Sequence, residues 1–148
     1  MRRTGFTTIE MVIVVVIIGI IAAMGFPTIR RSLDKVNVRS ARDALGTEAA
    51  IARSAAIQRG CRGVLHFTSG ANATVWVTTQ CGAKVDTVAG VEKLSSRFNV
   101  TLTATRDSVQ YDPRGLSLDN AVTLVRIDGK AGFKDSVQIN SIGKVVRP

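Results

Sequence analysis

The chain has 148 residues, a formal net charge of +9 and a sequence pI near 10.6. Once an apolar N-terminal stretch is set aside, this length leaves room for one small domain and excludes a second large core. Of the 20 basic residues, 18 remain against 11 acidic ones when Arg2 and Arg3 are removed. This basic balance suits DNA, anionic lipid headgroups or an acidic protein partner, and it says nothing about the fold.

The first predicted element is a membrane-spanning helix. Every residue from Met11 to Phe26 is apolar or glycine, and with residues 7–9 in front the helix reaches across roughly 30 Å of hydrocarbon. A secretory signal peptide or an ordinary single-pass anchor is the alternative, because residues 22–24 imitate a cleavage site. Glu10 argues against both alternatives, because neither has a use for an unpaired carboxylate at the head of an apolar run, which costs at least about 2.5 kcal/mol.

The residues before the apolar run resemble a known processing signal. The segment GFTTIE, residues 5–10, is similar to the type III signal of type IV prepilins. The resemblance implies that prepilin peptidase removes residues 1–5 by cutting between Gly5 and Phe6, and that the new amino terminus on Phe6 is methylated. It also implies that Glu10 neutralises the amino terminus of a neighbouring subunit inside a filament.

The orientation of the span follows from this resemblance and not from charge. Arg30, Arg31 and Lys35 come directly after the apolar run, so the positive-inside bias does not clearly favour a cytoplasmic N-terminus. The resemblance implies a single-pass inner-membrane protein with a cytoplasmic N-terminus and a periplasmic head, later built into a pilus or pseudopilus. Its partners would be other pilin or pseudopilin subunits, prepilin peptidase and the inner membrane.

The helix is predicted to continue far beyond the span. Gly19, Gly25 and Pro27 predict a bend, and the resemblance implies local melting between Gly19 and Pro27 in a filament. The apolar positions that follow are spaced three or four apart and predict an amphipathic helix that packs on the head: Ile29, Leu33, Val36, Ala41, Leu45, Ala49, Ala52 and Ala56. Gly60 should end the helix, about 50 residues and roughly 80 Å from Phe6.

Small residues in the second half of this helix predict a close approach to a sheet. The alanine-rich stretch covers residues 49–57. Within it, residues 52–57 (ARSAAI) resemble the ARSEAI-type segment of GspH/FimT pilin-like proteins, with alanine in place of glutamate. The chain is therefore identified by resemblance as a GspH/FimT-type minor pilin or pseudopilin precursor.

After Gly60 the sequence predicts a head made mostly of antiparallel sheet. Short β-prone runs are separated by turn residues: Val64 to Thr68, Thr74 to Thr79, Asn99 to Thr105, Val122 to Ile127 and Ser136 to Ile139. A turn centred on Ala71 pairs the first two runs and places Cys61 opposite Cys81. The two cysteines form either one disulfide or two buried thiols, and a disulfide outside the inner membrane would contribute about 3 kcal/mol.

No pattern in the head predicts an enzyme, a cofactor or a metal site. His66 is the only histidine and lies in a predicted strand, which favours a structural role. Aspartates near turns predict loop caps: Asp86, Asp107, Asp112, Asp119, Asp128 and Asp135. The YDPRG segment, residues 111–115, predicts a turn and resembles an aromatic-x-Pro-x-Gly element of the same family.

The C-terminal segment resembles a DNA-binding element with two departures. Residues 142–148 (IGKVVRP) are similar to the Gly-Arg-x-Arg segment of DNA-binding FimT proteins, with Lys144 replacing the first arginine and one more residue before Arg147. Together with Arg126, Lys130 and Lys134 these bases predict a stripe that tracks phosphates. The alternative, which we favour, is a solvated face whose charges protect an edge strand.

The predicted protein is an α+β, type IV pilin-like chain with a long N-terminal helix on a small antiparallel β-sheet head. Its expected segments are a leader (1–5), a transmembrane and filament-core helix (6–27), the amphipathic half of that helix (28–60) and a β-rich head (61–148). The expected function is that of a structural subunit of a type IV pilus or a type II secretion pseudopilus. The alternative is a FimT-like minor pilin that binds DNA for uptake in natural transformation, and a membrane-anchored enzyme is a remote third.

Overall fold

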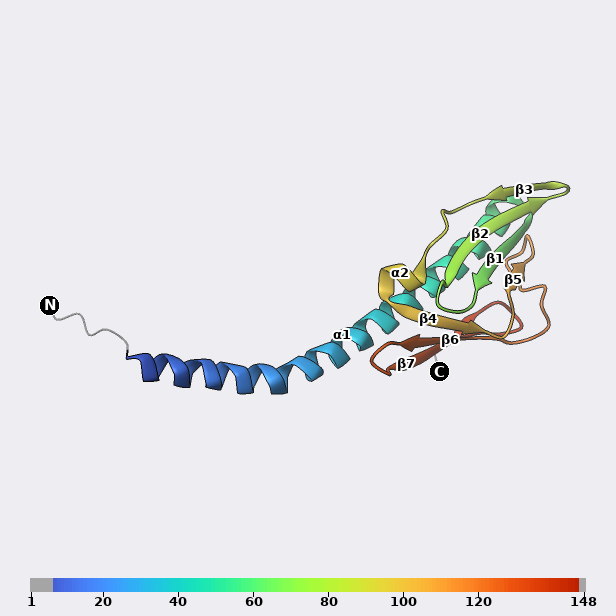
Figure 1. Cartoon of the computed structure of the whole chain (residues 1–148). Helices are drawn as coiled ribbons and strands as arrows, with labels where there is room; N and C mark the ends of the chain where they lie inside the picture. Colours follow the sequence, from blue (N-terminus) through green and yellow to red (C-terminus); the bar gives the residue numbers. More distant parts are fainter. Residues whose placement is uncertain (1–6, 147–148) are drawn as a thin grey trace.

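A computed structural model describes residues 7–146 and shows one long helix that carries a β-rich head at its C-terminal half (Figure 1). Helix α1 covers Thr8–Arg59, which is 52 residues. Thr7 caps its start, and Gly60 ends it in the left-handed conformation at φ 61°, a geometry that glycine adopts without a steric penalty. The prediction that the helix ends at Gly60 is confirmed.

Pro27 lies inside α1 without ending it. Proline has no N–H to donate and clashes with the preceding turn, which weakens a helix at that point. The segment from Gly19 to Pro27 is nevertheless helical in the single chain. Figure 1 shows the helix curving as it approaches the head. Melting of this segment inside a filament stays a prediction.

The second half of α1 packs on the head through a stripe of small and apolar side chains. Its buried residues are Asp34, Val38, Ala41, Leu45, Ala49, Ala52, Ala55 and Ala56. The expectation that the stripe begins at Ile29, Leu33 and Val36 is wrong, because each of these side chains is more than half exposed. The first buried residue of the stripe is Asp34, and the head leaves the faces of α1 that carry Ile29, Leu33 and Val36 uncovered.

Two four-stranded antiparallel sheets form the head, with strand orders β3-β2-β1-β5 and β4-β6-β7-β8. The first sheet contains β1 (Arg62–Thr68), β2 (Thr74–Cys81), β3 (Lys84–Thr87) and β5 (Ser108–Tyr111). The second contains β4 (Val100–Ala104), β6 (Thr123–Gly129), β7 (Lys134–Ile139) and β8 (Val145–Val146). A short helix, α2 (Leu94–Phe98), lies between them in the chain. The predicted fold class is confirmed.

The first hairpin has the register that its turn predicts. Arg62 pairs with Gln80 and Thr68 with Thr74, which centres the turn on Ala71. Cys61 and Cys81 are therefore opposite one another at the open end, and they form a disulfide with a Cα–Cα distance of 5.1 Å. Of the two alternatives that the cysteine count left open, the structure therefore shows one disulfide and not two buried thiols.

The alanine-rich part of α1 lets the first sheet approach the helix backbone. Ala52 and Ala56 are fully buried, and a Cβ placed on Gly63 of β1 would collide with the carbonyl oxygen of Ala52. Close helix–sheet contact of this kind requires small side chains on both elements. The predicted close approach is confirmed.

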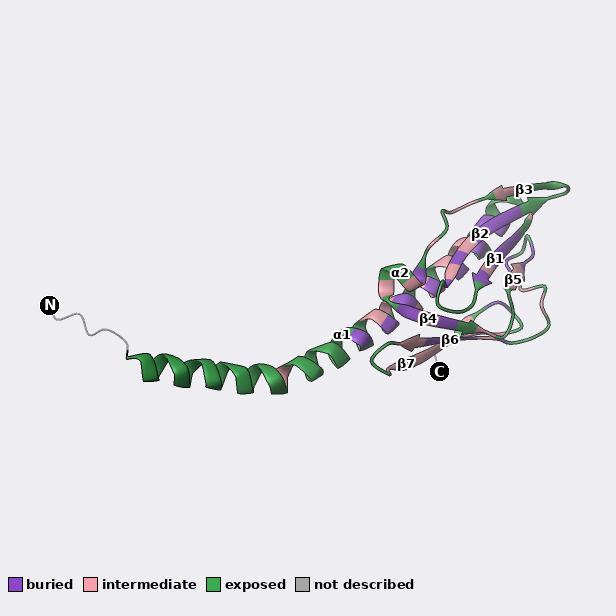
Figure 2. Ribbon diagram, in the orientation of Figure 1, coloured by how far each residue is buried: buried purple, intermediate pink, exposed green. Residues whose placement is uncertain are grey.

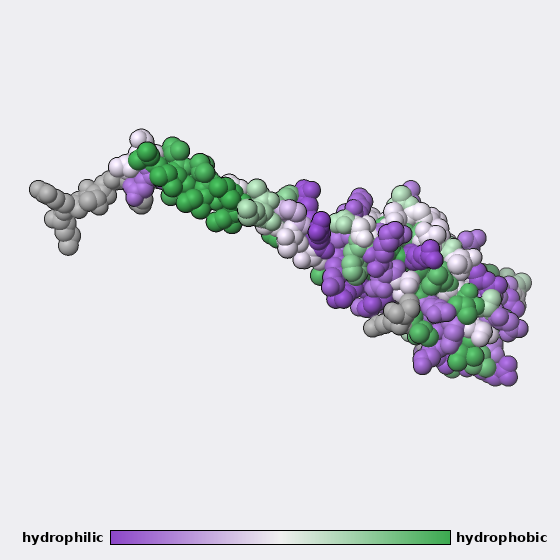
Figure 3. All heavy atoms as spheres, turned by 90° about the horizontal axis from the view of Figure 1, so that it is seen from below, coloured by the Kyte–Doolittle hydropathy of each residue, from purple (hydrophilic) through white to green (hydrophobic). Residues whose placement is uncertain are grey.

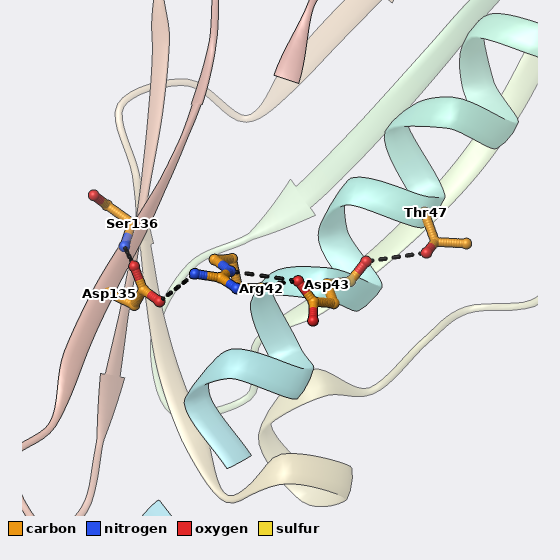
Figure 4. A network of polar contacts seen from close by, with 5 residues as sticks. All are labelled: Arg42, Asp43, Thr47, Asp135 and Ser136. Atoms are coloured by element: carbon orange, nitrogen blue, oxygen red, sulfur yellow. Dashed lines mark hydrogen bonds and ion pairs between the residues drawn. The ribbon is translucent and has the colours of Figure 1, made fainter. Parts of the chain in front are cut away.

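The second sheet is anchored to α1 by two acidic side chains. Asp34, only 7% exposed, accepts a hydrogen bond from the backbone N–H of Phe133 at 3.0 Å, and its carboxylate lies against Gly129. About two helical turns further along α1, the Arg42 guanidinium contacts the Asp135 carboxylate on β7 at 3.0 Å (Figure 4). These contacts hold the β6–β7 hairpin against the helix at the point where the head begins.

Candidate assembly site

The N-terminal half of α1 is apolar and uncovered. Its apolar window has no buried residue, and it is the one stretch within residues 7–146 that is long and apolar enough to cross a membrane. Figure 2 shows this half as exposed, and Figure 3 shows its surface as a continuous hydrophobic band that ends where the head begins. An exposed apolar surface of this extent is typical of a segment that contacts lipid or other protein chains.

Glu10 stands at the start of this band and takes part in a capping box. The Thr7 hydroxyl accepts a hydrogen bond from the Glu10 N–H at 3.3 Å, and the Glu10 carboxylate accepts one from the Thr7 N–H at 3.3 Å. Both bonds satisfy donors that a helix start otherwise leaves unpaired. Glu10 thus has a local role that sequence reasoning missed, although the Thr-x-x-Glu spacing indicates it.

The predicted processing site lies outside the described residues. Gly5 and Phe6, at the expected cleavage and methylation site, precede residue 7, and Arg147 follows residue 146. Their roles stay predictions.

The ARSEAI-like segment supports a loop of the head. A Cβ on Gly115 would lie 2.8 Å from Ile57 Cδ1 and 3.0 Å from Arg53 Nε, so the turn after β5 rests directly on these two side chains. Gly115 has φ 79°, a conformation that excludes most side chains independently of that contact. Ile57 is 50% exposed, which leaves an apolar group at the surface beside this turn.

The turn itself is organised by Asp112. Its carboxylate accepts hydrogen bonds from the backbone N–H groups of Arg114 and Leu116, both at 2.9 Å, and pairs with the Arg114 side chain. The backbone hydrogen bond from Leu116, followed by the contacts with Arg114, holds the pKa of Asp112 below its usual value although burial opposes the shift. The predicted structural role of this segment fits these contacts.

His66 makes structural contacts on the first sheet. Its ring stacks on Trp76 with centroids 4.9 Å apart, and its Nε2 lies 2.9 Å from the Thr78 hydroxyl. Burial lowers the pKa of the imidazole. Among residues 7–146 no cluster of three histidine, cysteine or acidic side chains is placed to hold a metal ion.

The basic residues predicted to form one stripe lie at three separate places. Arg126 of β6 and Lys134 of β7 line a shallow hollow of about 360 Å³ together with Asp128, and Lys134 pairs with that aspartate at 3.6 Å. Lys130 lies in the β6–β7 turn, beside Arg30 of α1. Lys144 lies at the other end of β7, where its backbone N–H donates a hydrogen bond to the Asn140 side chain. At the usual rise per strand residue, that end is about 20 Å from Lys134.

Asp34 is the functional residue that the sequence interpretation overlooked. It falls four residues before Val38 and seven before Ala41, which places it on the buried stripe of α1. A carboxylate at a core position of an amphipathic helix indicates a specific buried partner. That partner is the turn between β6 and β7, at the border between the exposed and the packed halves of the helix.

Comparison with known proteins identifies the fold. No protein-family model matches the sequence, and no curated protein matches it. The structure is similar to that of the type IV minor pilin FimU of Pseudomonas aeruginosa strain PAO1, with a TM-score of 0.63 and 11% identity over 77% of this chain and 90% of that chain. A second crystal form of FimU gives a TM-score of 0.59 and 11% identity over 74% and 91%. The chain therefore has a type IV pilin-like fold, as its residues suggested.

Proposed function

We propose that this chain, which has the fold of a type IV minor pilin, is a structural subunit of a type IV pilus or of a type II secretion pseudopilus. The observation that supports this most strongly is an apolar helix half with no buried residue, joined without interruption to a folded head. Such a helix is covered by lipid before assembly and by the same helix of other subunits afterwards. Removal of residues 1–5 by prepilin peptidase and methylation of Phe6 belong to the same proposal.

Glu10 is the proposed assembly residue. Its carboxylate is exposed at the head of the apolar band and forms no ion pair with any residue in the range 7–146. In a filament core that charge requires a partner, because an unpaired carboxylate surrounded by apolar groups is strongly unfavourable. The amino terminus of a neighbouring subunit, released by cleavage before Phe6, supplies it.

The test separates this ionic role from the capping box. Glu10→Gln keeps an acceptor for the Thr7 N–H but removes the charge, whereas Glu10→Ala removes both. If Glu10 neutralises a neighbouring amino terminus, both variants are cleaved normally and both fail to enter sheared filaments. Incorporation is measured by immunoblotting the filament fraction, and cleavage by the mass of the membrane-bound chain.

Two controls complete the experiment. Thr7→Ala weakens the capping box and leaves the charge in place, so it should retain filament incorporation. Gly5 substitutions should instead block cleavage itself. Normal incorporation of Glu10→Gln would contradict the ionic role and leave the capping box as the function of this residue.

A second candidate function is DNA binding by the outer face of the second sheet. Arg126 is exposed there and forms no ion pair within residues 7–146, and Lys144 lies along the same sheet about 20 Å from Lys134. Binding of duplex DNA by the full chain in neutral detergent, measured across a salt series, tests it. Micromolar affinity that falls steeply with salt and is lost in the double variant Arg126→Ala, Lys144→Ala would favour this function. The absence of binding at low salt would exclude it.

A further inference from the structure

The junction between the exposed half of α1 and the head contains a basic hollow that the assembly function does not use. It has a volume of about 380 Å³ and lies between α1 and the β6–β7 turn. Thr28, Arg31, Ser32 and Lys35 line it from the helix, and residues 131–133 line it from the turn. We call it the junction hollow.

The spacing of the helix residues explains their convergence. Positions 31 and 32 each lie three or four residues from both 28 and 35, so the four residues share one face of α1. The turn faces them because Asp34 binds the N–H of Phe133 and lies against Gly129. Figure 1 shows this turn extending from the head along the helix toward its exposed half.

The lining of the junction hollow has the chemistry of an anion site. It presents one guanidinium, one ammonium and two hydroxyl groups, and among residues 7–146 no acidic side chain lines it. Asp34, the nearest carboxylate in sequence, is buried against the turn backbone on an adjacent helix face. Arginine, lysine and hydroxyl donors are the groups that bind phosphate oxygens.

The position of the hollow along the helix selects the source of the phosphate. The apolar run ends at Phe26, and at 1.5 Å per residue Arg31 lies about 7.5 Å beyond it, which is the depth of the headgroup layer. Side chains on a helix tilt toward its N-terminus, so Arg31 and Lys35 reach back toward that layer. Figure 3 shows the hydrophobic band of the helix giving way to a polar surface at this level.

Aromatic and aliphatic side chains at the same level of α1, on faces turned away from the hollow, are also exposed. Phe26 is 57% exposed and lies under the Arg30 guanidinium at 4.4 Å, while Lys35 Nζ lies 5.9 Å from the Phe133 ring. Ile29 and Leu33, which the head leaves uncovered, lie within the same two turns of the helix. Exposed apolar groups that alternate with basic ones are typical of a helix at a lipid–water interface.

We propose that the junction hollow binds the phosphodiester headgroup of an anionic phospholipid, whose acyl chains lie along the exposed apolar half of α1. The bound lipid positions the head at the membrane surface before assembly. This inference rests on the membrane anchoring in the proposed function. The proposed lipid binding gives a specific role to the basic residues directly after the span. The orientation of the helix does not explain these residues.

The test measures which lipid the full chain retains. The chain is equilibrated in neutral-detergent micelles that contain equal amounts of phosphatidylglycerol and phosphatidylcholine, and native mass spectrometry counts the lipids that stay bound. We expect phosphatidylglycerol to be preferred, and the double variant Arg31→Ala, Lys35→Ala to lose about tenfold in affinity for it. The variant Arg31→Lys, Lys35→Arg keeps both charges and should keep the preference.

A matched control removes the same charge from the opposite end of the head. Arg62 of β1 and Lys84 of β3 are exposed and lie beside the disulfide, so Arg62→Ala, Lys84→Ala should bind phosphatidylglycerol as the unchanged chain does. Equal losses in both double variants would overturn the proposal, because they indicate a general charge effect. Binding of inorganic phosphate as tightly as phosphatidylglycerol would overturn the lipid assignment in favour of a free phosphate ligand.

A separate readout distinguishes failure of this inference from failure of the proposed function. Resistance to alkaline extraction from membranes reports insertion independently of lipid class. A chain that resists extraction but shows no preference for phosphatidylglycerol overturns only the junction hollow. A chain that is extracted contradicts the membrane anchoring and, with it, both proposals.

Discussion

The two halves of α1 belong to one continuous helix but meet opposite environments. The N-terminal half carries larger apolar side chains, such as Val15 and Ile21, and these are more than 60% exposed. The C-terminal half carries a stripe that is mostly alanine and almost fully buried against two sheets. Hydrophobicity alone therefore does not decide which half is covered within the chain. Small side chains let the head pack closely on one half, and the larger side chains of the other half stay exposed within the chain.

Removing the disulfide should have the largest effect, and that effect should be confined to the half that carries the head. Cys61→Ser, Cys81→Ser opens a loop whose ends are 20 residues apart, and the head should lose about 3 kcal/mol of unfolding free energy. Urea unfolding in neutral detergent, followed by the fluorescence of Trp76 in β2, measures this loss. Membrane insertion of the N-terminal half should not change, and a loss of insertion would contradict the independence of the two halves.

A single enlargement made in each half sharpens the comparison. Ala52→Leu forces a large side chain into the fully buried contact with Gly63, so we expect a loss of about 2 kcal/mol in the unfolding free energy of the head. Ala22→Leu makes the same change on the exposed half and should leave head unfolding unaltered. The same Trp76 fluorescence reports both variants, and an equal effect of the two would refute the contrast.

The boundary between the halves depends on Asp34. Asp34→Ala removes the acceptor for the Phe133 N–H and should destabilise the head by about 1.5 kcal/mol, with faster hydrogen exchange at that amide. Asp107→Ala, at an exposed loop position, is the matched control and should change neither quantity. Unchanged exchange at Phe133 in the Asp34 variant would show that the turn is held by other contacts.

The smallest expected effect is a pH dependence confined to the head. Burial lowers the pKa of His66 in the folded chain, so the unfolded chain takes up its proton first, at about pH 6.5. The contribution of neutral His66 to stability is complete above that pH and falls as the pH drops toward the folded pKa. Fluorescence of the stacked Trp76 should titrate below pH 6.5, and His66→Gln should abolish the transition.

The predicted disulfide and the missed strands show how far local patterns reach. The turn centred on Ala71 joins two adjacent runs, so its register follows from the sequence alone and pairs Cys61 with Cys81 correctly. Strands β3, β5 and β8 are short and pair with residues distant in the chain or follow a tight turn, so their own residues carry little period-two pattern. The division of the head into two sheets could not be predicted from the β-prone segments of the sequence.

The residues of the candidate site also fall into a group that the sequence predicted and a group that only the structure placed. Glu10 and the apolar run could be singled out from the sequence, because each is marked by residues that are neighbours in the chain, and the assembly role of Glu10 stays a prediction. The basic residues Arg126, Lys130 and Lys134 were predicted as one stripe, yet the β6–β7 turn sends Lys130 to the helix side while the other two face outward from the strands. Strand alternation and turn direction decide such placements.

The sequence by itself determined the helix, its capped ends, its uncovered apolar half and the first hairpin, since each depends on spacing within one segment. The tertiary structure alone decided where the head begins on the helix, because that point is the contact between Asp34 and a turn about a hundred residues away in the chain. It thereby left Ile29 and Leu33 exposed and brought Arg31 and Lys35 opposite the β6–β7 turn. Contacts between distant segments have no local signature, and they form the surface between α1 and the β6–β7 turn.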